Sequence, residues 1–458
     1  MGSAKLLMKA ALFIDQDRAA RALLANCLEE AGWQTHQADD AENGLRLAAR
    51  FHPEVVICAV HLSGSNGFQV CRALREAGHL NSPARIILVS TSPYAIDRLS
   101  AVEAGADDFW VKPLVSAELV ERLGRPQEFD REHPPVPKVG FGSIGPQAVV
   151  PFRAPQPNAQ TLVRFWGVRG SIPTPGPDTA FYGGNTACVE VRAGGRIIIL
   201  DGGSGIRPLG GALMTEAGGE GVECDILISH MHWDHIMGLA FFAPGYDPKS
   251  RVRIFGFPNA ERGLHETLAM LMRSPHFPID WRQLPSQIEV HELPAPKLQL
   301  GNTRVQAAWM NHPGICAGYR LDTAHGSLAY LPDHEPFQRY LAISEGSEGS
   351  SAARLDFARQ QDAQVRRFIE DCDLLIVDSQ YDSKEYPDYV GWGHGCASDA
   401  VNLALEARVK QVCLFHHDPS HDDSHLTRMA REAQQTADAT GSKLVVHCAR
   451  EGLEIVLG

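Results

Sequence analysis

The stretch that decides the fold is Ser229-His-Met-His-Trp-Asp-His-Ile-Met-Gly238. It directly follows an apolar run, Cys224-Asp-Ile-Leu-Ile228, which is typical of a buried β-strand. Two imidazoles two residues apart, His230 and His232, can reach one metal ion, and the Asp234-His235 pair on the next turn can reach a second ion nearby. The H-x-H-x-D-H spacing rarely arises from unrelated polar residues, so it predicts a two-metal site at the end of a strand.

This motif resembles the signature of the metallo-β-lactamase superfamily, whose fold is an αββα sandwich with a dinuclear site at one edge. The resemblance implies three more ligands at the ends of later strands, and the candidates occur in order: His312 in Asn311-His-Pro-Gly314, Asp333 in Ala329-Tyr-Leu-Pro-Asp333, and His416 in Gln411-Val-Cys-Leu-Phe-His416. It assigns the first ion to His230, His232 and His312, the second ion to Asp234, His235 and His416, and a bridging role to Asp333. His417 is the alternative to His416, which is preferred because the family ligand falls two residues after a leucine, here Leu414.

The cofactor implied by these residues is a pair of divalent metal ions. Zinc is the default, and a ligand set of Asp and His without cysteine also suits manganese or iron. Five other histidines fit no ligand position and are expected at the surface or in loops: His276, His291, His421, His425 and His447.

A second motif, Gly391-Trp-Gly-His394-Gly-Cys-Ala-Ser398, lies between the candidate bridging aspartate and the last ligand. It resembles the extra histidine motif of the superfamily's phosphodiesterase branch, which includes cyclic-phosphate phosphodiesterases and the tRNA 3′-processing nuclease. The resemblance implies that His394 contacts the scissile phosphate or protonates the leaving alkoxide, with Asp378 orienting the ring. Gly395 stands where the family usually has a hydroxyl residue, and the alternative is a histidine that caps a helix over 397–407.

Three Gly-rich segments resemble the opening strands of the same branch: Arg164 to Pro173, Tyr182 to Thr186 and Ile199 to Gly205. From them we expect substrate contacts by Arg169, Ser171 and Asn185, in addition to His394. Asp234 is expected to serve catalysis as well as metal binding.

The N-terminal part has a different pattern. Short apolar runs such as Ala10 to Asp15 and Val55 to Val60 alternate with segments of helical period such as Arg18 to Ala31, which predicts a doubly wound α/β domain. Together with the stretch from Gly105 to Pro113, these features resemble the receiver domain of bacterial response regulators, a flavodoxin-like fold.

In that family an aspartate at the end of the third strand accepts a phosphoryl group. Here the acceptor position is Ala59 and the second acidic position is Gln16, although Asp15, Ser90 and Lys112 remain. Shifting the alignment with the receiver family by a residue or two does not place an aspartate at the acceptor position, because no aspartate occurs between positions 40 and 97. An alanine methyl cannot be a nucleophile, so we expect a receiver-like domain for dimerisation or regulation that is not phosphorylated on aspartate.

Length and composition agree with this division. The 458 residues suggest two or three domains, and we predict a receiver-like domain at 8–125, a proline-rich linker at 126–160 and a hydrolase domain at 161–458. The last strand is expected near Leu444 to His447. No apolar run approaches the roughly 18–20 residues that cross a membrane. The single, scattered cysteines indicate reduced thiols in a cytoplasmic protein.

The net charge limits the class of substrate that the sequence predicts. With 42 Lys+Arg against 55 Asp+Glu, the net charge is -13, and the segment His334 to Asp373 is rich in Ser, Glu, Gln and Asp. A tRNA nuclease needs a basic docking surface, so nucleic acid is an unlikely partner. We therefore predict a phosphodiesterase of a small cyclic nucleotide or cyclic dinucleotide, acting as a homodimer. The alternatives are a thioester or lactone hydrolase, a tRNA-type nuclease, and a non-catalytic signalling adaptor.

Overall fold

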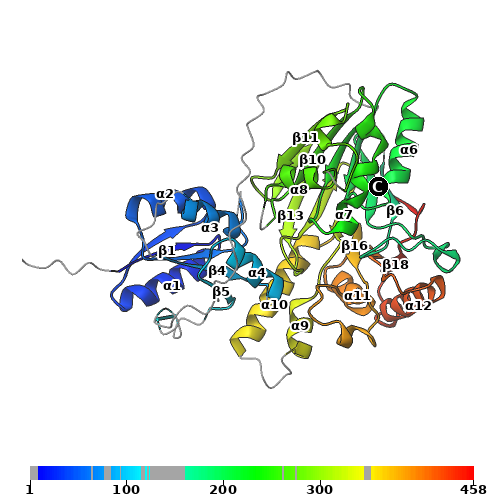
Figure 1. Cartoon of the computed structure of the whole chain (residues 1–458). Coiled ribbons are helices and arrows are strands. Elements are labelled where there is room, and N and C mark those ends of the chain that lie inside the picture. The colour runs from blue at the N-terminus through cyan, green and yellow to red at the C-terminus, as the bar shows by residue number, and fades with distance from the viewer. Residues whose placement is uncertain are drawn as a thin grey trace, which may run out of the picture.

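The computed structural model describes residues 9–62, 65–76, 84–92, 94–114, 119–120, 123, 160–259, 262–273, 276–344 and 352–458. Apart from residue 160, the predicted linker at 126–160 lies outside the described residues. The described chain forms two domains (Figure 1), which share one buried hydrophobic cluster.

The N-terminal domain is a five-stranded parallel sheet in the order β2-β1-β3-β4-β5. This is the flavodoxin-like strand order, as predicted. Its elements are β1 (Ala10–Ile14), α1 (Arg18–Glu30), β2 (Gln34–Ala38), α2 (Ala41–Phe51), β3 (Val55–Ala59), α3 (Gly67–Glu76), β4 (Arg85–Ser90), α4 (Ala95–Glu103) and β5 (Asp108–Val111). The central strand β3 is buried along its whole length, which explains its uninterrupted apolar sequence.

The C-terminal domain contains two seven-stranded sheets. The first has the order β11-β10-β9-β8-β7-β6-β19, and the second has the order β12-β13-β14-β15-β16-β17-β18. The strands of the first sheet are β6 (Thr161–Gly167), β7 (Cys188–Ala193), β8 (Arg196–Leu200), β9 (Glu223–Leu227), β10 (Arg251–Gly256), β11 (Gln287–Glu292) and β19 (Glu454–Leu457). Those of the second are β12 (Lys297–Leu300), β13 (Thr303–Trp309), β14 (Ala317–Thr323), β15 (Gly326–Leu331), β16 (Leu374–Asp378), β17 (Gln411–Phe415) and β18 (Val445–Cys448).

Side chains from both sheets meet in one core, which includes Leu200, Val305, Tyr319 and Phe415. Helices cover the outer faces, so the domain is the expected αββα sandwich. The α-helices are α6 (Ile206–Ala217), α7 (Trp233–Ile236), α8 (Leu264–Met270), α9 (Phe337–Ser344), α10 (Ala352–Ile369), α11 (Ala397–Glu406) and α12 (Asp423–Ala439). Short 3-10 turns are η1 (Pro177–Thr179), η2 (Met237–Phe241), η3 (Ala243–Tyr246), η4 (Trp281–Gln283) and η5 (Tyr386–Asp388).

The prediction of the last strand was wrong. A strand does lie at Val445–Cys448, but the chain continues into β19, Glu454–Leu457, which pairs antiparallel with β6. Its alternating burial, with Ile455 and Leu457 buried, fits an edge strand that has one face on the core. This strand closes the first sheet at the edge opposite β11.

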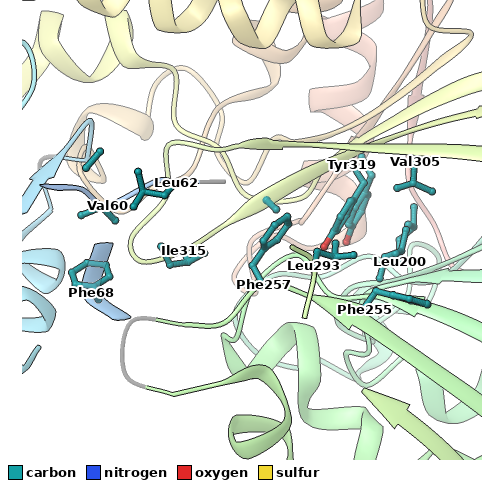
Figure 2. Packing of buried hydrophobic residues seen from close by; sticks show 14 of the residues in the cluster. Val60, Leu62, Phe68, Leu200, Phe255, Phe257, Leu293, Val305, Ile315 and Tyr319 are labelled. Carbon is teal, nitrogen blue, oxygen red and sulfur yellow. The ribbon is translucent and has the colours of Figure 1, made fainter. Parts of the chain in front are cut away.

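The two domains share a hydrophobic cluster. Val60, Leu62 and Phe68 of the N-terminal domain belong to the same buried cluster as Ile315 and Phe257 of the C-terminal domain, and Figure 2 shows Ile315 between the two groups. This apolar contact holds the N-terminal domain against the chain that follows β13.

Polar and aromatic contacts surround this cluster. The side-chain amide of Asn66 donates to the carbonyl oxygens of Pro258 and Asn259, at 3.2 Å each. The rings of His61 and Trp309 are stacked with 5.1 Å between centroids. The interface therefore combines apolar burial with directional contacts.

Candidate metal centre

The predicted ligands meet at one edge of the sandwich because each follows the end of a strand. His230 and the Asp234-His235 pair follow β9, and His312 follows β13. Asp333 follows β15 and His416 follows β17. These strands end at the same side of the two sheets, so residues nearly 190 positions apart in sequence form one cluster.

The first donor group contains His230, His232, His312 and Asp333, whose ligand atoms all lie within 4.8 Å of one another. His312 Nε2 lies 3.0 Å from His232 Nδ1, and Asp333 Oδ2 lies 3.5 Å from Nε2 of both His230 and His312. Ligand atoms of a tetrahedral ion with bonds of about 2.0–2.2 Å are roughly 3.3–3.5 Å apart. The spacing therefore matches a metal site.

The second group contains Asp234, His235 and His416. Nε2 of His416 lies 3.0 Å from Asp234 Oδ2 and 3.2 Å from Nε2 of His235. The other oxygen of Asp333, Oδ1, lies 3.2 Å from Nε2 of His235 and 3.4 Å from Nε2 of His416. Asp333 thus presents one oxygen to each group, which is the arrangement of a bridging carboxylate.

The hydrogen bonds on the far side of the rings show which nitrogens carry lone pairs. His235 Nδ1 lies 2.8 Å from the carboxylate of Asp201, and His416 Nδ1 lies 3.0 Å from Oε1 of Gln380. Both partners are acceptors, so in a neutral ring each Nδ1 carries the proton and each Nε2 offers a lone pair. Two lone pairs and the Asp234 carboxylate then face one another.

The same logic applies to the first group. Nδ1 of His312 donates to the carbonyl oxygen of Gly393 at 2.8 Å, which leaves its Nε2 as an acceptor facing His232. Nε2 of His230 and Oδ1 of Asp333 are buried without a hydrogen-bond partner. Converging acceptors without donors are costly unless a cation lies between them, so the residues present fit two divalent ions.

The electrostatics of the centre favour metal binding. Burial alone raises the pKa of Asp333, but the imidazoles around it, His235 and His416 first, lower that pKa well below its usual range. Burial lowers the pKa of His230 and His312 well below normal. Burial also lowers the pKa of His235, but the carboxylates of Asp333, Asp234 and Asp201 outweigh burial and raise that pKa well above its usual range. A cation bound here would therefore take the place of a proton between carboxylates and imidazoles.

His394 lies beside both donor groups. Its ring centroid is 5.0 Å from that of His312 and 5.0 Å from that of His416. Its Nδ1 lies 2.8 Å from Oδ2 of Asp378, at the end of β16. Burial lowers the pKa of His394, but the Asp378 carboxylate outweighs burial and raises that pKa to about 9.

His416 and His417 differ clearly. His416 is in the second donor group, in a left-handed backbone conformation with φ 61°. His417 lies outside that group, because its Nε2 contacts the carbonyl oxygen of Ala449 at 2.8 Å. The structure therefore brings His416, the preferred candidate, together with the other predicted ligands.

Unlike the metal ligands, the residues predicted to contact substrate do not all point toward the donor groups. Arg169 has an exposed fraction of 0%, and its guanidinium donates to the carbonyl oxygens of Gly183, Asp418 and His421. A buried arginine that ties loops together cannot offer a surface cation, so its position does not match the expected role. The side chain of Asn185 is also engaged, because it bonds Glu451 at 3.2 Å and Ser204 at 2.9 Å.

Ser171 lies next to the centre through its backbone. Its N–H donates to Asp234 Oδ2 at 2.7 Å, while its side chain is exposed. It therefore stays close enough to meet a substrate, although its shown contact is with a ligand residue.

Two residues outside the predicted set support the ligands. Asp201, which follows β8, accepts hydrogen bonds from the backbone N–H and hydroxyl of Ser229, from the Tyr330 hydroxyl at 2.8 Å, and from His235. Glu335, two residues after Asp333, is fully buried and accepts four hydrogen bonds. An acid directly after a buried strand signals Asp201 in the sequence, whereas no local signal marks Glu335.

The degenerate phosphoacceptor region faces the C-terminal domain. Nζ of Lys112 and Oδ2 of Asp15 form an ion pair at 2.6 Å, next to Ala59. A cavity of about 160 Å³ lies here, and its lining includes Trp309 of the C-terminal domain and Gln361 of α10. The position that holds an acceptor aspartate in receivers is therefore a methyl group at a domain boundary.

Comparison with known protein families identifies the family of each domain. Residues 11–124 match the family described as "Response regulator receiver domain", and residues 218–417 match the "Beta-lactamase superfamily domain". The chain joins a receiver domain to a metallo-β-lactamase-fold domain. The receiver domain is 31% identical over 112 residues to the response regulator MprA of Mycobacterium leprae, which covers 24% of this chain and 48% of that protein. It is also 34% identical over 116 residues to the transcriptional regulatory protein AfsQ1 of Streptomyces coelicolor. That match covers 25% of this chain and 50% of AfsQ1. The chain thus spans about half the length of the curated relatives it matches.

Among solved structures, similar chains include the metallo-β-lactamase-fold protein YhfI of Bacillus subtilis, with TM-score 0.45, 17% identity, and 65% of this chain and 99% of that chain covered. The short form of human tRNase Z has TM-score 0.42 and 18% identity, with 65% and 99% covered. A diphosphatase of the PhnP family has TM-score 0.42 and 16% identity, with 64% and 97% covered. Among the described residues, no helix is both long enough and apolar enough to span a bilayer.

Proposed function

We propose that the metallo-β-lactamase-fold domain is a dinuclear metal-dependent phosphodiesterase that hydrolyses a cyclic nucleotide or cyclic dinucleotide. The observation that carries this proposal is the His394–Asp378 pair, 2.8 Å apart and next to both donor groups. Hydrolysis of an alkyl phosphodiester needs a proton donor for the leaving oxygen, and a histidine oriented by a carboxylate supplies one.

The chemistry divides between the ions and the protein. Two bound divalent ions supply an activated water and neutralise charge on the phosphoryl group. A water oxygen bonds to phosphorus while the bond from phosphorus to the leaving oxygen breaks; His394 transfers its proton to that oxygen, and the proton that the water loses passes to solvent. Asp378 stabilises the protonated ring before transfer, and Asp234 and Asp333 contribute the carboxylates of the ligand set.

Exposed aromatic residues beside the centre support a nucleotide substrate. Trp233 lies between His232 and Asp234 in sequence and is 72% exposed, and Trp392 lies two residues before His394 and is 62% exposed. Large apolar side chains at the surface often mark binding sites. Aromatic faces stack on nucleobases with about 1–3 kcal/mol per base, so these residues suit a substrate that carries a base.

The insertion between Asp333 and β16 argues against a tRNA substrate. It forms α9 and α10, and Phe357, Gln361 and Gln364 of α10 line cavities against the receiver domain. Its helices therefore belong to the domain boundary and do not form a free basic arm. Together with the net charge of -13, this supports a small diester over a nucleic acid.

We also propose that the receiver domain acts without aspartyl phosphorylation. Ala59 offers no nucleophile, and Asp15 is already neutralised by Lys112 at 2.6 Å. The homodimer and the cytoplasmic location that the sequence suggests remain predictions, and light scattering on purified protein would test the first.

The test is hydrolysis of a panel of cyclic mononucleotides and cyclic dinucleotides by the zinc- or manganese-loaded protein, with products separated by chromatography. Turnover of at least one cyclic nucleotide is expected, and it should disappear in Asp234→Ala. Hydrolysis of thioesters or lactones without any turnover of phosphodiesters would refute the proposal.

A further inference from the structure

Glu335 is the centre of a hydrogen-bond network behind the first donor group. Its Oε1 accepts from the Tyr386 hydroxyl at 2.7 Å and from the Gly391 N–H at 3.0 Å, and its Oε2 accepts from the Gly393 N–H at 3.1 Å. The carbonyl of Gly393 in turn accepts from His312 Nδ1 at 2.8 Å. One buried carboxylate thus fixes the loop that orients a metal ligand and carries His394.

The fourth donor to Glu335 comes from the receiver domain. The hydroxyl of Tyr94, which precedes α4, donates to Glu335 Oε2 at 2.9 Å and lies 3.4 Å from the carbonyl oxygen of Asn311. Tyr94 is only 6% exposed. A charged acceptor buried with four donors forms strong bonds, and removal of one donor leaves the carboxylate less well held.

A second receiver residue holds the other side of His312. Oδ1 of Asp97 in α4 accepts from the Gly314 N–H at 3.0 Å. The next residue, Ile315, packs into the shared cluster with Phe68 of the receiver domain (Figure 2). The receiver domain therefore contacts the chain on both sides of this ligand, at residues 311 and 314.

We propose that Tyr94 is a positioning residue of the metal centre, so that the receiver domain forms part of the shell that orients His312 and the His394 loop. It acts through Glu335 and Gly393 and touches no substrate. The proposal rests on the proposed metal-dependent function, and it gives the receiver domain a route to the active site that needs no phosphorylation. Any ligand or partner that moves the start of α4 would act on the hydrolase by this route.

The experiment compares Tyr→Phe variants in the full-length protein. Tyr94→Phe removes one hydroxyl and keeps the ring, and Tyr386→Phe removes the hydroxyl that the hydrolase domain itself gives to Glu335. Loss of a bond behind a metal ligand typically lowers metal affinity or activity by about 10–100-fold. The hydroxyls of Tyr94 and Tyr386 lie two hydrogen bonds beyond the bond between His312 and Gly393. We therefore expect the low end of that range: both variants should lower zinc affinity and kcat about tenfold, with KM nearly unchanged.

Tyr246→Phe is the matched control, because its hydroxyl donates to the carbonyl of Ala240 and takes no part in the Glu335 network. Zinc affinity is measured by competition with a chromogenic chelator, which needs no substrate and so separates this proposal from the proposed reaction. Circular dichroism and thermal melting check folding. If Tyr94→Phe matches Tyr246→Phe in zinc affinity and kcat, the proposal is wrong, whatever Tyr386→Phe does.

A second cluster of metal-binding side chains lies outside the dinuclear centre. One ligand atom from each of Glu385, His421 and His425 falls within 4.8 Å of the others. His421 Nε2 lies 2.9 Å from Glu385, and His425 Nε2 lies 3.5 Å from Asp382. Both histidines were expected at the surface or in loops; His421 lies in the loop before α12, but it is only 3% exposed.

The two rings are stacked, with 3.8 Å between centroids and an interplanar angle of 11°. His421 Nδ1 and His425 Nε2 are buried without a hydrogen-bond partner. A nearly buried histidine with an unpartnered nitrogen, a second imidazole and two carboxylates make a donor set suited to a borderline divalent ion.

We infer that this cluster is a third divalent-cation site, which links the start of α12 to the loop between β16 and His394. Its test is the metal content of the untagged full-length protein after zinc loading and gel filtration, measured by plasma mass spectrometry. We expect three zinc ions per chain, and two in His425→Ala and in Glu385→Gln. His447→Ala, whose ring contacts Gln411 outside both clusters, should keep three.

The dinuclear centre is tested separately by Asp234→Ala, which should keep the zinc ion held by His421 and His425. Two ions per chain in the unchanged protein, or three in both His425→Ala and Glu385→Gln, would overturn the inference. Circular dichroism identifies a variant that has failed to fold. If one of His425→Ala and Glu385→Gln does not fold, the zinc content of the other tests the inference.

Discussion

Replacement of His394 by alanine tests the proposed acid directly, because its effect depends on the leaving group. The ring is buried against ligands of both donor groups and hydrogen-bonded to Asp378 at 2.8 Å. A positioned general acid contributes about 10²–10⁴-fold to the rate when the leaving oxygen needs a proton. The leaving alkoxide of a cyclic nucleotide needs one, whereas p-nitrophenolate is stable without it.

We therefore expect His394→Ala to lower kcat for the cyclic nucleotide by about 10²–10⁴-fold, and kcat for bis-p-nitrophenyl phosphate by about tenfold or less. The assay measures both substrates on the same zinc-loaded preparation, with zinc content checked for each variant. His447→Ala serves as the control, because that ring contacts Gln411 away from the centre. Equal losses on both substrates would refute the role as an acid and leave His394 only a binding or structural role.

The pH profile adds an independent check. Asp378 raises the pKa of His394 to about 9 against the effect of burial, so the protonated ring is present below that pKa and is lost as the pH rises through it. Bound cations lower this pKa in every variant, so the comparison is relative. Asp378→Asn should therefore move the alkaline limb of kcat to lower pH, and an unmoved limb would contradict the pairing.

Further predictions concern the ligands, the bases and the receiver domain. Asp234→Ala and His235→Ala should each lose zinc from the dinuclear centre and lower turnover of bis-p-nitrophenyl phosphate by more than about 10³-fold without loss of fold; retained turnover would contradict the site. Trp233→Ala and Trp392→Ala should raise KM for a cyclic nucleotide about tenfold with kcat little changed, as expected for lost base stacking; a change in kcat alone would argue against stacking. Incubation with a small-molecule phosphodonor should add no phosphoryl mass to the protein by intact mass spectrometry, because Ala59 cannot accept it, and a stoichiometric addition within the receiver domain would disprove this.

The ligands could be predicted because each belongs to a short local pattern. His230 and its neighbours form a motif of contiguous residues after an apolar strand, and His312, Asp333 and His416 each end a recognisable strand. Strand ends in a sandwich converge on one edge, so the chain order and the fold together imply a cluster. The apolar and helical periods of the N-terminal part predicted a doubly wound α/β domain, whereas the αββα sandwich was implied by the resemblance of the metal motif.

Burial and contacts between domains have no such local signal. Arg169 was expected to contact substrate because its segment resembles the phosphodiesterase branch and a diester needs local positive charge, but tertiary packing buries it completely. Glu335 and Tyr94 are 241 positions apart and meet only because the two domains dock. His421 was expected at the surface or in a loop because it fits no ligand position of the dinuclear motif, yet it is buried in its loop and pairs with Glu385. Roles that depend on such distant partners can be read only from the folded chain.

Substitutions on two sides of the receiver domain should have opposite effects on kcat and zinc affinity. On the side of the former phosphate pocket, Lys112 and Asp15 neutralise each other at 2.6 Å with both side chains partly exposed, and such pairs contribute about 1 kcal/mol or less. Lys112→Ala should therefore leave kcat and zinc affinity unchanged and alter only the stability of the receiver domain slightly. On the α4 side, Tyr94→Phe should change both quantities, and loss of its buried hydrogen bond to the Glu335 carboxylate should also cost about 1.5–3 kcal/mol of stability. If instead Lys112→Ala lowers kcat, the region of Asp15, Ala59 and Lys112 is energetically coupled to the metal centre. The contact of Tyr94 with Glu335 would then not be the main coupling between the domains.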